Sequence, residues 1–331
     1  MKRFWRGLFL TATWIVLVAL TLWAIGALYF DFPVATLRKP AAIVYALAVL
    51  AIVALVRRRW QKAAFIAAGF IVVLGWWLTL QPSNDRDWQS DVAQTAWAEI
   101  DGDRVTLHNV RNNEYRTETD YTLHWETRTV DLSRLRGIDL FINYWGPEWM
   151  AHPIVSFQFD DALPVCFSIE VRLQKGEEYS SLGGIYRYAE LIYVCADERD
   201  VVRLRSNFRS VQDVYLYRTT ATPPQARERF VEYLRMLNSM REHPRWYNAL
   251  TTNCTTAIRA QRAAEQRLPW DWRILLNGYL DQMLYEHGTL AGDLPFAQLK
   301  EAVHVNAAAR VANDAADFSA RIRAGRPGFS R

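Results

Sequence analysis

Residues 152–173, HPIVSFQFDDALPVCFSIEVRL, carry the pattern that decides the fold of the soluble part of the chain. Apolar and polar side chains alternate on both sides of the turn at residues 160–164, which is typical of two half-buried antiparallel strands. If the turn closes a hairpin with Phe159 near Val165, His152 lies opposite Glu170 or Arg172. The pattern therefore predicts an antiparallel sheet with a histidine and a glutamate on one face.

Residues 247–259, YNALTTNCTTAIR, predict a polar loop that delivers a cysteine to the first turn of a helix. Thr251, Thr252 and Asn253 are residue types that accept hydrogen bonds from the free amides at a helix start. Cys254 then lies at the positive end of the helix dipole, which favours the nucleophilic thiolate. The alternative is a small buried cysteine, because free cysteine is among the most buried residue types.

A cysteine nucleophile needs a base, and the base needs a third group that fixes its tautomer. We predict His152 as the base and Glu170 as the third group, with Ser168 in reserve. Amides near the helix start, with Asn253, are expected to stabilise an oxyanion. Taken alone, His152 is more often a surface or core-edge histidine.

No His, Cys, Asp or Glu cluster in the sequence has the spacing of metal ligands, so we expect neither a metal nor a cofactor. The net charge of +4 comes mostly from basic clusters near apolar segments. It is therefore no argument for nucleic-acid binding, and we expect no nucleic-acid partner.

Three apolar runs precede the soluble part, at residues 8–30, 41–56 and 63–80. Each approaches or exceeds the length needed to cross a bilayer. A cleaved signal peptide would explain only the first run. We predict a membrane region at 1–80, a linker at 81–92 and a soluble domain at 93–331.

Basic residues flank these runs unevenly. Seven lie before the first run or between the second and third: Lys2, Arg3, Arg6, Arg57, Arg58, Arg59 and Lys62. The side richer in Lys and Arg faces the cytoplasm, so three spans place the following domain outside it. We predict a bacterial inner-membrane protein with a periplasmic domain.

The rest of the chain gives a coarser pattern. Residues 111–136 are interpreted as extended surface chain. A hairpin centred in residues 176–184 would make Cys166 and Cys195 cross-strand neighbours, and we predict a disulfide between them. Further strands are expected at 95–110 (a hairpin), 138–144, 191–196, 201–205 and 214–217, and helices at 223–244, 275–285 and 296–323.

Several motifs together resemble the Lnb-type N-terminal periplasmic domain family. They cover nearly everything from about Trp97 onward and are Trp145-Gly146, His152 with its strand, Ile169 to Arg172, Lys175 to Tyr179, Tyr193 to Asp200 and Tyr247 to Thr256. The resemblance implies an α+β fold of the circularly permuted papain-like type, related to NlpC/P60 proteins, with the family's histidine and cysteine at His152 and Cys254.

The family takes its name from a lipoprotein N-acyltransferase. The resemblance therefore implies a membrane-anchored thiol acyltransferase or hydrolase, with membrane phospholipid and a lipoprotein as partners. Two other classes stay open, a cell-wall peptidase or amidase of NlpC/P60 type and a non-catalytic envelope scaffold.

Overall fold

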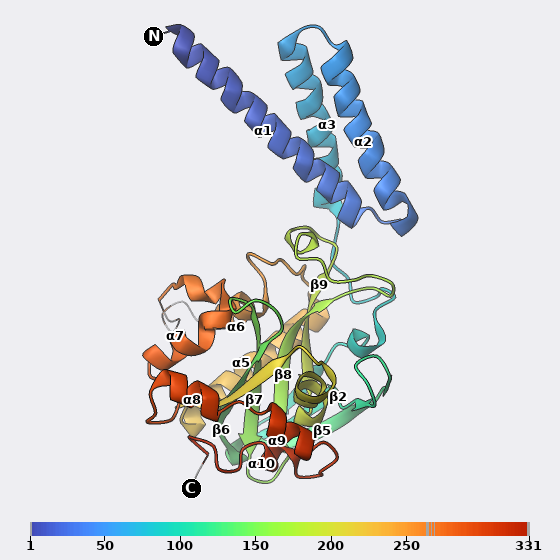
Figure 1. Ribbon diagram of the computed structural model, residues 1–331. Coiled ribbons are helices and arrows are strands. Elements are labelled where there is room, and N and C mark those ends of the chain that lie inside the picture. The colour runs from blue at the N-terminus through green and yellow to red at the C-terminus, as the bar shows by residue number, and fades with distance from the viewer. Residues whose placement is uncertain (1, 263–264, 266, 268, 330–331) are drawn as a thin grey trace. The chain divides into compact units, whose positions relative to one another are not determined.

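The computed structural model describes residues 2–262, 265, 267 and 269–329 (Figure 1). The chain divides into two compact units. The helical unit contains Met1–Ser83, Glu178–Glu190 and Trp246–Ala249. The sheet unit contains Asn84–Glu177, Leu191–Arg245 and Leu250–Arg331.

The helical unit contains three long helices, drawn in blue in Figure 1. They are α1 (Lys2–Asp31), α2 (Ala35–Leu55) and α3 (Arg59–Thr79). Each is long and apolar enough to span a membrane, as the sequence predicted. α2 and α3 begin earlier than the apolar runs, because a helix satisfies its own backbone across the charged residues that flank such a run.

Two later segments fold with the ends of these helices. Asp31 accepts hydrogen bonds from Trp77 Nε1 at 2.6 Å and from the Arg187 backbone amide at 3.1 Å. The Arg187 guanidinium lies 3.8 Å from the centre of a Trp77 ring. Ala249 N donates to Gly184 O at 2.7 Å, which joins residues 246–249 to residues 178–190. The helical unit therefore includes the chain just before the cysteine loop.

The sheet unit is built on a mixed, mostly antiparallel sheet in the order β1-β2-β9-β8-β7-β6-β10, with β5 paired to β2. The pairing of β2 with β9 is parallel. The strands are β1 (Trp97–Asp101), β2 (Arg104–Arg111), β5 (Trp125–Asp131), β6 (Leu135–Tyr144), β7 (Ala151–Phe159), β8 (Val165–Arg172), β9 (Glu190–Ala196) and β10 (Asp213–Arg218). Two short strands, β3 (Glu114–Tyr115) and β4 (Tyr121–Thr122), form a separate pair.

Local sequence signals correctly predicted two hairpins. In the first, Asp101 pairs with Arg104, and Gly102 has a φ of +59° that a tight turn between these strands requires. In the second, Ile154 pairs with Ser168 and Phe157 with Val165. Continuing this register by two residues places His152 opposite Glu170, the first of the two predicted partners.

The two faces of the sheet are covered by different helices (Figure 1). One face packs Phe141, Ile154 and Cys166 against α4 (Glu198–Arg203), α9 (Asn306–Val311) and α10 (Phe318–Arg321). On the other face, Phe157 and Phe167 pack against Phe230 and Tyr233 of α5 (Pro223–Glu242). Since side chains alternate along a strand, His152, Ser168 and Glu170 share the face of Ile154 and Cys166.

The strand predicted at 201–205 is wrong. Asp197 accepts a hydrogen bond from Arg199 N and caps α4, which continues into the π-helix η4 (Leu204–Phe208). The short apolar segment 201–205 is also compatible with a buried helix, because all five of its side chains are buried. Residues 111–136, interpreted as extended surface chain, contain the strands β3, β4 and β5.

The predicted disulfide between Cys166 and Cys195 is also wrong. Both residues are buried with free thiols. The prediction assumed a hairpin turn after β8, but the intervening chain contains the 3-10 helix η3 (Gly183–Ile185) and folds with the helical unit. A connection of this length does not set the register of the strands that it joins.

From Cys254 onward the described chain contains several short helices. They are α6 (Cys254–Ala260), η6 (Trp272–Ile274), η7 (Asn277–Tyr279), α7 (Leu280–Glu286) and α8 (Phe296–Ala302), followed by α9 and α10. The single helix predicted at 275–285 is therefore two elements, and the helical chain predicted at 296–323 is three. A further 3-10 helix, η2 (Leu132–Arg134), lies between β5 and β6, and η1 (Ser90–Val92) precedes β1.

Candidate functional site

Cys254 is the first residue of α6, as its sequence context predicted. Asn253 caps this helix, since its Oδ1 accepts hydrogen bonds from Thr255 N at 3.0 Å and Thr256 N at 2.9 Å. Thr256 Oγ1 in turn accepts from Asn253 N at 2.9 Å, which completes a capping box. Cys254 is partly exposed, whereas Cys166 and Cys195 are buried. The capping box of Asn253 and Thr256 therefore holds the partly exposed thiol of Cys254 at the start of a helix.

His152 on β7 contacts the thiol and two groups of β8. Its Nε2 lies 2.7 Å from Ser168 Oγ and 3.3 Å from Glu170 Oε1. A hydrogen bond to Cys254 is among the interactions that raise its pKa. The structure thus brings together Cys254, His152, Ser168 and Glu170, from α6 and from two neighbouring strands.

The hydrogen bonds of Ser168 determine the tautomer of His152. The Ser168 hydroxyl donates its one proton to Glu170 Oε1 at 2.5 Å, because an ionised carboxylate can only accept. Ser168 Oγ must then accept from His152, so His152 Nε2 carries a proton. Nδ1 is the remaining ring nitrogen and is the one left to interact with the Cys254 thiol.

Arg205 from η4 completes the hydrogen-bonded group formed by His152, Ser168 and Glu170. Its Nη2 donates to Glu170 Oε1 at 2.5 Å, and its Nη1 donates to Val201 O at 2.8 Å. Three groups, from Arg205, Ser168 and His152, therefore converge on one carboxylate oxygen. π-Helical turns such as η4 are rare and are often found at functional sites.

The charges of His152 and Glu170 are determined by the groups around them. Burial alone would lower the pKa of His152, but the Glu170 carboxylate and the Cys254 and Glu170 hydrogen bonds outweigh it and raise the pKa to about 9. Burial would raise the pKa of Glu170, yet His152 and Arg205 hold it well below its usual range. At neutral pH His152 is thus cationic and Glu170 anionic.

Asn277 of η7 places an amide group beside the thiol. Its Nδ2 lies 3.5 Å from Cys254 Sγ and 3.2 Å from Thr255 Oγ1. Its Oδ1 accepts from Ala151 N at 2.8 Å, which fixes the side chain against the start of β7. The side-chain amide beside Sγ is that of Asn277, whereas the Asn253 oxygen caps the helix.

Neither Arg205 nor Asn277 was predicted from the sequence as a site residue. Arg205 fell in a segment predicted as a strand, and Asn277 fell inside a predicted helix. Neither position follows a local motif, since each depends on contacts with distant residues. Residue type was the signal available for both. An arginine is suited to pair with a carboxylate, and a side-chain amide is suited to stabilise an oxyanion.

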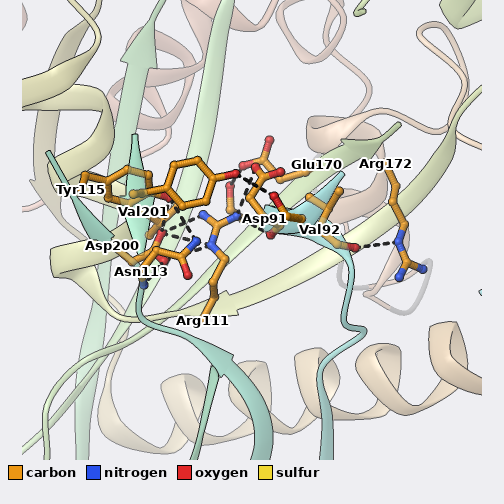
Figure 2. A network of polar contacts seen from close by, with 12 residues as sticks. Asp91, Val92, Arg111, Asn113, Tyr115, Glu170, Arg172, Asp200 and Val201 are labelled. Carbon is orange, nitrogen blue, oxygen red and sulfur yellow. Dashed lines mark hydrogen bonds and ion pairs between the residues drawn. The ribbon is translucent and has the colours of Figure 1, made fainter. Parts of the chain in front are cut away.

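A second polar cluster consists of Asp200, Arg111, Asn113 and Tyr115, and we call it the Arg111 cluster. Its Asp200 belongs to the α4–η4 stretch that also carries Arg205. Figure 2 shows Asp200 of α4 between Arg111, Asn113 and Tyr115. Arg111 Nη2 donates to Asp200 Oδ1 at 2.8 Å, Asn113 N donates to Oδ2 at 2.7 Å, and Tyr115 OH lies 3.4 Å from Oδ1. This cluster fixes α4 to β2 and thereby positions the start of η4.

In the part of the chain that the structure describes, no group of three or more His, Cys, Asp or Glu side chains is arranged to hold a metal ion. The site is therefore described by its protein groups alone. Its ionised pair, tautomer-fixed histidine, accessible thiol and neighbouring amide are the components that thiol-dependent acyl transfer requires.

Comparisons with known proteins agree with the resemblance seen in the sequence. The family model of the Lnb N-terminal periplasmic domain matches residues 121–278, a range that includes His152, Ser168, Glu170, Cys254 and Asn277. Searches of curated proteins and of solved structures gave no match. The chain therefore combines three helices that are long and apolar enough to span a membrane with a segment, residues 121–278, that matches the Lnb N-terminal periplasmic domain family.

Proposed function

We propose that this protein is a thiol acyltransferase or hydrolase of the bacterial inner membrane, acting on a lipid or lipoprotein in the periplasm. The observation that carries the proposal is the contact between the Cys254 thiol and a histidine whose other nitrogen is held by Ser168 and Glu170. A pKa of about 9 keeps His152 protonated beside Cys254, where it can act as a proton donor to a leaving group.

In the proposed reaction, Cys254 Sγ attacks the carbonyl carbon of an acyl ester and forms a carbon–sulfur bond. The tetrahedral oxyanion is stabilised by Asn277 Nδ2, assisted by amides of the first turn of α6. His152 gives its Nδ1 proton to the leaving alkoxide as the carbon–oxygen bond breaks. A thioester on Cys254 and a free alcohol result.

The second half of the reaction returns the enzyme to its starting state. An amine or a water molecule attacks the thioester carbonyl, and His152 Nδ1 accepts its proton. The carbon–sulfur bond then breaks and releases the Cys254 thiolate. Glu170 and Ser168 keep Nε2 protonated throughout, so His152 exchanges protons only through Nδ1.

Two features of the chain support an acyl substrate from the membrane and a papain-like ancestry. Three helices anchor the chain where phospholipid and lipoprotein are available. The histidine precedes the cysteine in the chain and lies on a strand while the cysteine starts a helix, an order that suits a circularly permuted papain-like domain. The fold assignment is part of this proposal.

Intact-protein mass spectrometry tests the proposal. The purified full chain is incubated with phospholipid vesicles, and Cys254 is expected to gain the mass of one acyl chain that hydroxylamine removes. Cys254→Ala should gain none. Release of peptides from purified cell wall without acylation would favour a peptidase instead, and unchanged complementation by Cys254→Ala would favour a non-catalytic scaffold.

A further inference from the structure

An apolar surface borders the proposed nucleophile. It consists of Trp149, Trp270, Trp272, Leu275 and Leu276, whose side chains are between 39% and 62% exposed, and we call it the apolar rim. Large apolar side chains that are exposed singly are ordinary, but a group that contains three tryptophans is not.

Contacts between the rim residues place them around the amide that touches the thiol. Leu276 directly precedes Asn277, and Leu275 N and Leu276 N donate to Trp272 O at 2.9 and 3.2 Å. Gly278 N donates to Trp149 O at 3.0 Å. A side chain at Gly278 would collide with Glu148 O at 1.9 Å, so this glycine permits the close approach of the Trp149 loop.

A positive charge lies beside the rim. The Arg259 guanidinium of α6 is 5.9 Å from the centre of the Trp270 ring. Tryptophan side chains concentrate at the boundary between hydrocarbon and headgroups, and basic side chains there attract lipid phosphates. The rim therefore combines the residue types of a lipid interface at the edge of the candidate site.

We propose that the apolar rim inserts into the bilayer interface, so that the acyl chains of a membrane phospholipid enter the site over Leu276 and Trp272. The chain tethers itself to a bilayer through three apolar helices, so lipid is the apolar phase always available to it. A stable protein partner needs about 20 to 30 residues a side, which five rim residues do not supply. The inference takes Cys254 as the nucleophile proposed above.

Insertion of the apolar rim is tested by measuring the membrane depth of spin labels, an experiment that does not depend on enzyme turnover. The full chain carries Cys254→Ala and one added cysteine, either Leu276→Cys or Trp272→Cys, labelled with a nitroxide in phospholipid nanodiscs. Cys166 and Cys195 are buried and should not react in the folded protein. Leu163→Cys is the matched control, since Leu163 is exposed and lies in the turn at the other end of β7 from His152.

We expect the labels at 276 and 272 to collide more often with oxygen than with a water-soluble nickel complex, and the label at 163 to show the reverse. Nickel accessibility at 276 and 272 equal to that at 163 would overturn the proposal. So would dipolar coupling between labels of two chains, because the rim would then be an interface between copies.

A rate measurement separates this inference from the proposed function. Trp270→Ser should lower the rate with bilayer phospholipid about tenfold, since part of an aromatic side chain no longer leaves water, and should leave the rate with a short, water-soluble acyl ester unchanged. Equal losses on both substrates would count against insertion. Absence of activity in the parent chain would refute the proposed function while the depth result still decides insertion.

Discussion

The site and the Arg111 cluster use the same kind of ion pair for different purposes. Both pair an arginine with a carboxylate, and the α4–η4 stretch supplies one partner of each, Asp200 and Arg205. Arg111 and Asp200 are almost fully buried, whereas the Glu170 side chain is 22% exposed. Only the site adds a histidine and a thiol.

The difference explains what each cluster contributes. Burial would lower the pKa of Arg111, but Asp200 more than offsets it and raises that pKa, while burial raises the pKa of Tyr115 to about 12. Neither Arg111 nor Tyr115 therefore changes its charge near neutral pH. His152, with a pKa of about 9, is able to release its proton nearer to neutral pH, so the same kind of ion pair stabilises the fold in one place and is available to the proposed chemistry in the other.

The largest expected effect is that of Cys254→Ala, which should abolish turnover and the acyl mass because the covalent route is lost. The melting temperature should stay near that of the parent, since no large apolar side chain is removed. Cys195→Ala is the control. Its thiol is buried with a pKa raised by that burial to about 12, so activity should persist. Parental activity in folded Cys254→Ala would refute the catalytic role.

Asp200→Asn should affect folding rather than chemistry. It removes the closest counter-charge of the buried Arg111 guanidinium and leaves it only Asp91 at 3.8 Å, which should lower the free energy of unfolding by about 3 to 5 kcal/mol. Chemical denaturation of the full chain in detergent measures this. Asp120→Asn, which removes the exposed partner of Arg116, should leave the unfolding midpoint unchanged. Equal effects of the two substitutions would show that the Arg111 cluster is not structural.

In contrast to Asp200→Asn, Glu170→Gln should cause a large loss of activity and a smaller loss of stability. We expect turnover to fall about 100-fold, in the range of general-base assistance, because His152 loses the charge that holds it protonated. The high-pH limb of the pH–rate profile should move to lower pH, since the pKa of His152 falls. An unchanged profile with parental activity would transfer the orienting role to Ser168.

The histidine also predicts how stability varies with pH. The pKa of His152 is about 9 in the folded protein and about 6.5 in an unfolded chain, so the folded state binds the extra proton. Its contribution to stability is fully present below pH 6.5 and is lost as pH rises towards 9, with a slope of at most about 1.4 kcal/mol per pH unit. The melting temperatures of parent and His152→Gln should therefore converge over this window. A constant difference would contradict the ion pair.

Ser168→Ala should have the smallest effect. His152 Nε2 keeps a contact with Glu170 at 3.3 Å, so we expect turnover to fall only about tenfold, the worth of one hydrogen bond. Steady-state rates of Ser168→Ala and Glu170→Gln, measured together, give the comparison. A larger loss for Ser168→Ala would mean that the hydroxyl, and not the carboxylate, determines the tautomer.

The sequence by itself determined the features that depend on neighbours in the chain. Alternation around a short turn set the β7–β8 register, and with it the shared face of His152, Ser168 and Glu170. Cap residues placed Cys254 at the start of α6, and apolar runs predicted three spanning helices. These signals are local, because strand period, helix capping and span length each act over a few residues.

Tertiary structure decided the rest. A capped, largely buried segment became α4 and a π-helix, which carries Arg205 to Glu170, and a broken helix brings Asn277 to Cys254. Cys166 and Cys195 remained free because a long connection, not a turn, joins their strands. The physical reason is common to all three. Such contacts join residues far apart in the chain, and their geometry follows from how whole elements pack, which no short sequence pattern contains.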